Sequence, residues 1–565
     1  MAATLGRAQR LGALVAWLAL GATAAPVRAS DLLVAPNAVV AADNELASRA
    51  GVEVLQAGGN AVDAAVAVGL TLGVVNPFAS GIGGGGFLVF RDAETGEVVA
   101  LDFREMAPAA AHRDMYVIDG VHDPEASRYG GLAVGVPGEA AGWWEVHQRY
   151  GRLDWAAVVE PARRMAAEGF PAGTLLEDRL ISAEERMQAF PDIRTHFQTD
   201  GRWYEAGDTV VRPGLGRVLE TFAAEGRQGF YSGWVADDIV ASVSAAGGII
   251  THDDLLAYEP RWLEPVSSTY RGHEVYGMPA PSSGGLVVAQ VLATLDAFEL
   301  GRGAYDDAIT AHIVMQAFAH AFADRAAHLG DPDFWPIPVE RFLGAARTEE
   351  ILAAYRPTHT LEVEDYGPLI AAEADGGTSH FSIVDDEGNA VACTVTVNTS
   401  FGPLVIGAES DIVFNNEMDD FAAQPGVPNA FGLVGGEANA VEAGKRPLSS
   451  MSPTIVVRDG ELVGVLGGSG GPMIITETVL GILQMIDFGR DAAEAVAAPR
   501  YHHQWLPFVA ILEDTSGASW SELLPEFGYA VVQNSFGSAL QIVWRHPEGW
   551  QAASDPRKHG APAGY

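Results

Sequence analysis

The sequence predicts a layered α/β fold in which helices cover both outer sides of two packed β-sheets. Three observations support this fold class: residues 45–75 repeat apolar and small residues with a helical period, residues 378–466 alternate as strands, and residues 473–498 return to the helical pattern. Helices, strands, strands and helices in this order are typical of helix layers outside a pair of sheets. No internal repeat and no linker rich in Pro, Ser or Gly divides the chain.

The N-terminus has the features of an export signal. Arg7 and Arg10 precede the apolar run "LGALVAWLALGATAA", and small residues follow it. The run is short for a membrane span and no other segment offers one, so an uncleaved anchor is only the alternative interpretation. We expect residues 1–29 to be a signal peptide, cut after Ala25 or Ala29, and the mature protein to be periplasmic or secreted.

The rest of the chain follows the predicted layers in order. Two helices flank a Gly-Gly break in residues 45–75, and the runs "GIGGGGFLVFRD" and "VVALDFREMAP" are short and rich in β-formers. Residues 130–350 are expected to be mostly helical, with a long helix near residues 306–329. The later strands have hairpin signals, "DDEGN" and "RDG", at their tips. The four consecutive glycines at 83–86 lack the Lys-Ser or Lys-Thr of a phosphate loop, so we interpret them as close backbone packing.

Composition limits the classes of partner and cofactor. Of the 565 residues, 73 are Asp or Glu and 34 are Lys or Arg, so the formal charge is −39 and nucleic acid is a poor partner. Cys393 is the only cysteine, which excludes an internal disulfide. His320, Asp324 and His328 could form a metal-binding helix face, but no fourth ligand is evident nearby. We therefore predict no metal and no cofactor. The adjacent histidines at 502 and 503 are interpreted as structural, and no GxSxG elbow supports a serine triad.

A threonine opens the central strand run directly after two glycines, at Gly376-Gly377-Thr378. A threonine hydroxyl needs a base to act as a nucleophile, and the threonine's own α-amine can serve if the preceding peptide bond is cut. Glycines allow the strained and closely approached backbone that such a cut requires. Taken alone, a Gly-Thr pair is a very weak signal, and an ordinary strand start would be the preferred interpretation.

Several motifs surround this threonine in a specific order. The segments "LDFREMAP", "GGNAVDAAVA", "TSHFSIVDDEGNAVACTVTVNTSFG", "NNEMDDFA", "KRPLSSMSPTIVV", "GGSGGPMIIT" and "PRYHHQW" together resemble the γ-glutamyltransferase family (γ-glutamyl transpeptidases, glutathione hydrolases) from about residue 35 to about 545. The resemblance implies an N-terminal-nucleophile hydrolase fold, a four-layer αββα sandwich. It also implies a precursor that cuts itself between Gly377 and Thr378 into a large subunit, residues 30–377, and a small catalytic subunit, residues 378–565.

The resemblance further implies transfer of a γ-glutamyl group from glutathione or a related amide to water, an amino acid or a peptide. Thr378 would be the nucleophile, Thr396 would position it, and the backbone N–H groups of Gly470 and Gly471 would bind the oxyanion. The remaining implied residues bind the substrate's α-carboxylate (Arg104, Ser449, Ser450) and its α-ammonium (Asn398, Glu417, Asp420). The loop near residues 425–440 resembles a lid, with Phe431 where tyrosine is common. A cephalosporin or glutaryl acylase of the same fold and an unprocessed binding protein are the alternatives.

Overall fold

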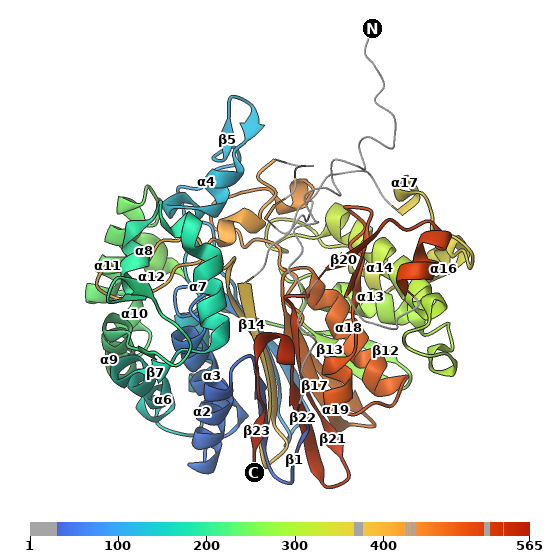
Figure 1. The fold of residues 1–565 in the computed structure, drawn as a ribbon, viewed down its shortest axis with the longest axis horizontal. Coiled ribbons are helices and arrows are strands. Elements are labelled where there is room, and N and C mark those ends of the chain that lie inside the picture. Colours follow the sequence, from blue (N-terminus) through green and yellow to red (C-terminus); the bar gives the residue numbers. More distant parts are fainter. Residues whose placement is uncertain are drawn as a thin grey trace.

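Two seven-stranded antiparallel sheets lie face to face, with helices on both outer sides (Figure 1). This arrangement confirms the predicted four-layer αββα sandwich. The computed structural model describes residues 31–366, 377–424, 427, 429, 430, 433, 435–513, 520–534 and 536–565. The predicted signal peptide, Gly376 and Phe431 lie outside the described residues.

The first sheet carries the predicted nucleophile on a central strand. The hairpin of β14 and β15 lies at its middle, and the "DDEGN" tip forms the turn, as predicted. The neighbours of this hairpin come from the N-terminal part of the chain, so the sheet depends on contacts between distant segments. In spatial order the strands are β11 (Arg261–Leu263), β4 (Val98–Phe103), β3 (Gly85–Arg91), β15 (Ala390–Asn398), β14 (Gly377–Val384), β2 (Val39–Ala42) and β23 (Ala563–Gly564).

The second sheet packs its inner face against β14 and β15, mainly through β17 and β21. Its hairpin of β16 and β17 turns at the predicted "RDG" tip. In spatial order its strands are β1 (Leu33–Ala35), β22 (Gly549–Ser554), β21 (Ala539–His546), β17 (Glu461–Ser469), β16 (Thr454–Arg458), β13 (His273–Gly277) and β12 (Val266–Tyr270).

Helices rich in small residues cover the first sheet. α3 is buried along its whole length, because its Ala, Gly and Val side chains allow the helix axis to approach the strands closely. Asn60 caps its N-terminus through a capping box with Asp63. The helices of this layer, which lie at the left of Figure 1, are α2 (Glu45–Gln56), α3 (Ala61–Val75), α5 (Glu139–Tyr150), α6 (Trp155–Glu168) and α9 (Pro213–Glu225).

A second helix layer covers the other sheet, at the right of Figure 1. α13, α18 and α19 contact the strands, and α14 packs on α13. The helix predicted near 306–329 and the helical return at 473–498 are both confirmed. The helices of this layer are α13 (Gly284–Leu295), α14 (Ala308–His328), α18 (Met473–Ile486) and α19 (Ala492–Ala497).

Further helices and small sheets surround the two main sheets. The remaining helices are α4 (Pro124–Arg128), α7 (Thr174–Met187), α8 (Pro191–His196), α10 (Gln228–Tyr231), α11 (Gly233–Ala245), α12 (His252–Ala257), α15 (Val339–Leu343), α16 (Ala345–Ala354), α17 (Val363–Tyr366) and α20 (Trp520–Leu523). The remaining strands are β5 (Val117–Ile118), β6 (Val121–His122), β7 (Phe170–Pro171), β8 (Gln198–Thr199), β9 (Arg202–Trp203), β10 (Thr209–Val210), β18 (Tyr501–His502), β19 (Ala510–Glu513) and β20 (Val531–Asn534).

The mostly helical prediction for residues 130–350 missed strands that belong to the two main sheets. β11 extends the first sheet, and the hairpin of β12 and β13 forms an edge of the second. Arg271 and Gly272 both have positive φ at the hairpin tip, as a type I′ turn requires. Their Arg-Gly pair is a weaker turn signal than Asn-Gly, because arginine rarely adopts this conformation.

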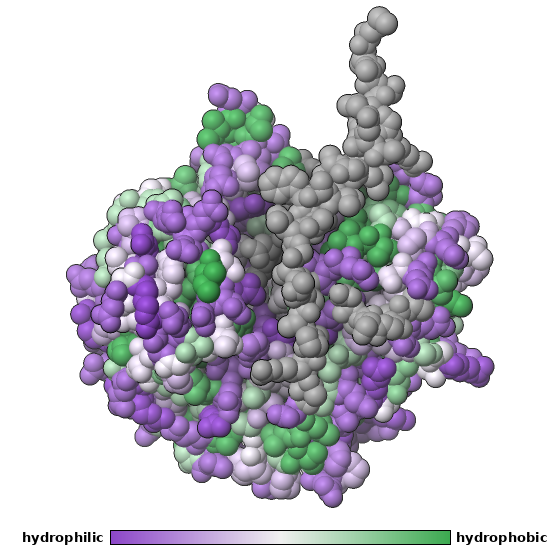
Figure 2. Space-filling model, viewed as in Figure 1, coloured by the Kyte–Doolittle hydropathy of each residue, from purple (hydrophilic) through white to green (hydrophobic). Residues whose placement is uncertain are grey.

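The face of the molecule drawn in Figure 2 is mainly hydrophilic, in keeping with the large negative charge. Figure 2 shows hydrophobic residues as separate patches on one face, including one on the projecting hairpin of β5 and β6, where Ile118 and Val121 are exposed. Within the described ranges, no helix is both long and apolar enough to cross a membrane.

Candidate active site

Thr378 lies at the start of β14, where the backbone register changes. Gly377 is opposite Asn398, whereas Thr378 is opposite Thr396, so the pairing slips by one residue between the two. A Cβ on Gly377 would lie 2.9 Å from the carbonyl oxygens of Phe78 and Thr399. Only glycine therefore fits at this position, which gives a physical reason for the glycine before the threonine.

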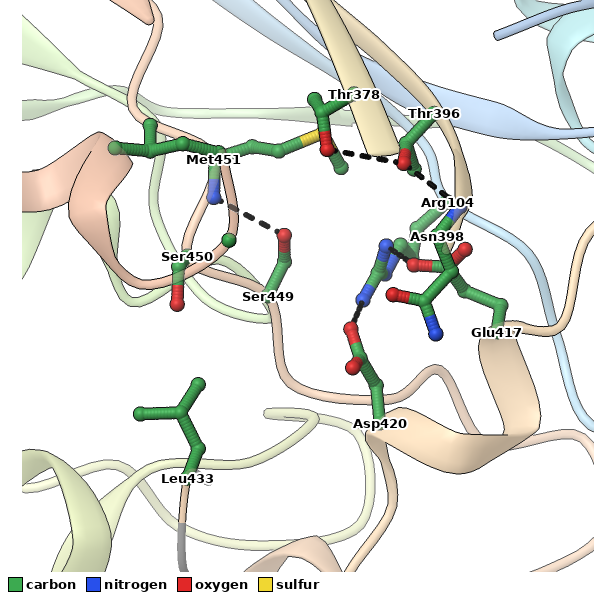
Figure 3. Close-up of a pocket in the computed structure, with 12 residues that line it drawn as sticks. Arg104, Thr378, Thr396, Asn398, Glu417, Asp420, Leu433, Ser449, Ser450 and Met451 are labelled. Carbon is green, nitrogen blue, oxygen red and sulfur yellow. Dashed lines mark hydrogen bonds and ion pairs between the residues drawn. The ribbon is translucent and has the colours of Figure 1, made fainter. Parts of the chain in front are cut away.

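The Thr396 hydroxyl lies between the Thr378 hydroxyl and the backbone of Asn398 (Figure 3), and it also contacts the peptide bond before Thr378. Its oxygen lies 3.2 Å from the Thr378 hydroxyl oxygen and donates to the Gly377 carbonyl at 2.8 Å. It also accepts the backbone N–H of Asn398 at 2.8 Å. A hydroxyl has one proton and two lone pairs, so a Thr396 that donates to Gly377 must accept the proton of Thr378. This leaves the Thr378 oxygen with lone pairs for attack.

Asn398 follows in a left-handed conformation, with φ of 75°. Its side-chain amide donates to the carbonyl of Asn416 at 2.9 Å, and asparagine is among the residues that tolerate this backbone conformation best. The left-handed turn ends β15 beside the cavity and holds the side chain there.

The predicted substrate-binding charges are in direct contact with one another. The Arg104 guanidinium forms ion pairs with Glu417 and with Asp420, the latter at 2.5 Å, and lies 3.8 Å from Glu105. Arg104 follows β4, whereas the two acids lie on the 3₁₀ helix η3 (Glu417–Asp420). The structure thus brings both predicted sides of the substrate clamp together, and a bound carboxylate would have to compete with these acids for the guanidinium.

Burial sets the protonation of this cluster. It raises the pKa of Glu417 well above its usual range and that of Glu105 to about 7, although Arg104 opposes both shifts. The pKa of Asp420 is also raised by burial. The three carboxyls thus compete for one guanidinium, and burial favours the neutral form of each. In the described part of the chain, the second carboxylate oxygen of Glu417 has no hydrogen-bond partner.

Two loops complete the walls of the site. Ser449 and Ser450 lie before β16, and the Ser449 hydroxyl accepts the backbone N–H of Met451 at 3.1 Å. Gly470 and Gly471 follow β17 with positive φ values of 136° and 60°. This conformation strongly favours glycine and turns the chain into α18.

One cavity unites the predicted residues. It includes every one of them except Gly470, which precedes a lining residue, and it has a volume of about 20 Å³, room for about one water molecule. Leu433 of the predicted lid loop also lines it. The full lining is Arg104, Thr378, Thr396, Asn398, Glu417, Asp420, Leu433, Ser449, Ser450, Met451, Gly471 and Ile474.

Lys558 was not predicted as a site residue, yet it contacts β14, the strand that carries Thr378. Its ammonium donates to the carbonyl of Thr378 at 2.8 Å and to the hydroxyl of Ser469 at 2.7 Å, and it lies 3.6 Å from Asp43. Ser469 directly precedes Gly470, so the lysine links Thr378 to the glycine loop, which we define as Gly470 and Gly471. The chain has only two lysines, and this rarity was the one signal in the sequence that could have singled it out.

The other histidine and acid candidates lie away from this cavity. Asp324 forms ion pairs with Arg341 and Arg347, so its carboxylate is occupied by arginines. The histidines at 502 and 503 are buried, and a ring nitrogen of His502 lies 2.9 Å from the Thr476 hydroxyl of α18. No group of three or more potential ligands is arranged for a metal among the residues that the structure describes.

Comparison with known proteins places the chain in a family. A family model described as Gamma-glutamyltranspeptidase matches residues 47–565. The chain belongs to the gamma-glutamyltranspeptidase family. The glutathione hydrolase proenzyme of Escherichia coli K12 is 41% identical over 536 residues, which are 94% of this chain and 91% of that protein. The corresponding proenzyme of Pseudomonas sp. A14 is 43% identical over 475 residues, 84% of this chain and 82% of that protein.

Solved structures agree with family membership and with the fold. A cephalosporin acylase from Bacillus halodurans superimposes with a TM-score of 0.84 at 27% identity, covering 97% of this chain and 99% of that chain. The gamma-glutamyltranspeptidase of Helicobacter pylori superimposes with a TM-score of 0.55 at 38% identity, covering 56% of this chain and 91% of that chain. The resemblance noted in the sequence motifs is thereby confirmed, and the protein belongs to an enzyme family.

The contacts of Lys558 lead to a prediction about the stability of this gamma-glutamyltranspeptidase family member. We expect Lys558→Met to lower the free energy of unfolding by roughly 3–5 kcal/mol, because it leaves the Asp43 carboxylate buried without its cation. Combining it with Asp43→Asn should recover much of the loss, since the uncompensated charge is removed. Urea unfolding of the three proteins tests this. Equal stability of the single variant and the wild type would show that the pair does not act in this way.

Proposed function

We propose that the protein transfers the γ-glutamyl group of glutathione and related γ-glutamyl amides to water or to amino-acid and peptide acceptors. The observation that carries the proposal is the single cavity in which the Thr378 hydroxyl and a buried Arg104–carboxylate cluster face each other. A γ-glutamyl group has a reactive carbonyl at one end and an α-carboxylate with an α-ammonium at the other. The site has a nucleophile for the first and charges of both signs for the second.

The first reaction in this proposal is cleavage of the chain itself. The Thr378 oxygen attacks the Gly377 carbonyl carbon, while the Thr396 hydroxyl, 2.8 Å from that carbonyl oxygen, stabilises the developing negative charge. The C–N bond breaks, the nitrogen takes the proton that the Thr378 hydroxyl has lost, and an ester joins Gly377 to the threonine oxygen. Water then hydrolyses the ester, which leaves Gly377 as a carboxylate and Thr378 with a free α-amine.

The free amine then acts as the base in catalysis. It takes the Thr378 hydroxyl proton as the oxygen attacks the γ-carbonyl, and the N–H groups of Gly470 and Gly471 bind the oxyanion. The donor amine leaves with a proton, and a γ-glutamyl-threonine ester remains. Water or an acceptor amine attacks this ester and regenerates the threonine. No cofactor is needed in any of these steps.

Substrate recognition in this proposal uses two parts of the cavity wall. One is the charged cluster around Arg104, and the other is the serine loop, which contains Ser449 and Ser450. Arg104, Ser449 and Ser450 bind the α-carboxylate, since a guanidinium fork matches a carboxylate in a bidentate manner. Asn398, Glu417 and Asp420 accept from the α-ammonium. The position of these three residues together on the wall of the cavity supports the ammonium assignment.

We also propose that the protein is exported and works as a pair of subunits. Residues 1–29 would be removed, residues 30–377 would form the large subunit and residues 378–565 the small one. Each main sheet contains strands from both segments, so the two parts would stay together after cleavage. The first residue of the large fragment isolated from cells tests the export step.

The first prediction of this proposal concerns Thr378. Thr378→Ala should block chain cleavage and turnover together, because one hydroxyl performs both attacks, whereas Thr378→Ser should retain a measurable part of each. Mass spectrometry of the wild type should find a fragment from Thr378 to Tyr565. A Thr378→Ala protein that is still cut at this bond would rule out the threonine as the processing group, and an intact single chain with full activity would contradict the mechanism.

The second prediction separates substrate recognition from processing. Arg104→Ala should leave cleavage nearly complete, because the carboxyls around it can take up protons, but it should lower kcat/KM for a γ-glutamyl amide about 30-fold to a few thousand-fold. A butanoyl amide lacks both the α-carboxylate and the α-amine, so its kcat/KM should fall much less. Equal losses for the two amides would remove Arg104 from the clamp and favour the acylase alternative.

A further inference from the structure

Arg325 is a buried arginine behind the serine loop of the cavity. It lies in the last turn of α14, and its side chain is 3% exposed. Its Nε donates to the Ser283 hydroxyl at 2.9 Å, and its Nη2 donates to the Ser450 hydroxyl at 3.3 Å. Neither the sequence motifs nor the proposed clamp includes it.

The arginine differs from its neighbours in how its charge is compensated. Arg104 and Arg446 each form an ion pair with a buried carboxylate. Arg325 has no carboxylate within 4.0 Å in the described ranges of the chain, and its observed acceptors are two neutral hydroxyls. A buried cation without an anion is costly, so an anion that enters the adjacent cavity would be favoured there.

Hydrogen-bond accounting gives the arginine a second effect. A guanidinium has donors only, so Ser450 must accept from Arg325, and the Ser450 proton is directed elsewhere. Ser450 lines the cavity, and its hydroxyl can donate to a ligand there. Ser283 likewise accepts from Arg325 and donates to the carbonyl of Ser449 at 2.6 Å, which fixes the backbone of the same loop.

The electrostatic surroundings agree with this geometry. Burial lowers the pKa of Arg325 to about 10, the charge of Asp420 opposes this shift and that of Arg104 adds to it. Arg325 therefore lies close enough to both clamp charges to interact with them. It stays protonated at neutral pH and adds a second positive charge on the serine side of the cavity.

We propose that Arg325 is a positioning residue for the α-carboxylate of the substrate: it orients the Ser450 hydroxyl to donate into the cavity and supplies a positive charge behind the serine loop. This inference rests on the proposed γ-glutamyl activity. It assigns the arginine to recognition of the carboxylate and gives it no part in the chemistry at Thr378.

Two amides with the same leaving group test the proposal. One carries a γ-glutamyl group, and the other carries a 4-aminobutanoyl group, which keeps the amine but lacks the α-carboxylate. Arg325→Met should lower kcat/KM about 10-fold to 100-fold for the first amide, mainly through KM, and less than about 3-fold for the second. Arg325→Lys should recover part of the loss, because it keeps the charge without the fork. His328→Gln, in the same turn of α14, is the control and should change neither.

Each outcome of this experiment has a defined meaning. Equal losses for the two amides, or no loss for either, would overturn the proposal. If Arg325→Met fails to fold or to be cut, Arg325→Lys decides: a γ-glutamyl preference below that of the wild type supports the proposal, and an unchanged preference overturns it. A wild type that shows no preference for the γ-glutamyl amide would instead refute the proposed function, before the arginine is in question.

Discussion

The Thr396 hydroxyl is the contact on which the site depends, because its one proton and two lone pairs are all engaged. It donates to the Gly377 carbonyl and accepts from Asn398 and Thr378. This arrangement requires the slip in register between β14 and β15, and the slip in turn requires glycine at 377. One cross-strand pair therefore holds both the peptide bond that we propose is cut and the nucleophile that cuts it.

Buried charges hold the other walls of the cavity around this pair. Lys558 links the carbonyl of Thr378 to the strand that leads into the glycine loop, so the nucleophile and the proposed oxyanion donors are fixed to each other. Across the cavity, Arg104 forms ion pairs with Glu417, Asp420 and Glu105. In the empty site the arginine and the acids of the clamp therefore pair with one another. A zwitterionic substrate would replace these ion pairs with pairs to its own α-carboxylate and α-ammonium, at limited desolvation cost.

The sequence predicted those parts of the fold that depend on local pattern. The paired helices at 45–75, the long helix near 306–329 and the two hairpin tips follow from periodicity and turn residues. The hairpin of β12 and β13 escaped prediction because its tip contains an arginine with positive φ. The site residues were identified through motifs that resemble a family, since no local pattern could bring Arg104 beside Glu417, 313 residues away. Lys558 and Arg325 were missed because their roles arise from contacts between layers.

The most direct test of the account is to identify the residue that a γ-glutamyl analogue with an electrophilic group modifies. The purified protein is treated with the analogue, digested and mapped by mass spectrometry. The account predicts one adduct, on the side-chain oxygen of a Thr378 that is also the first residue of its fragment. An adduct on another residue, or on a Thr378 still joined to Gly377, would contradict it.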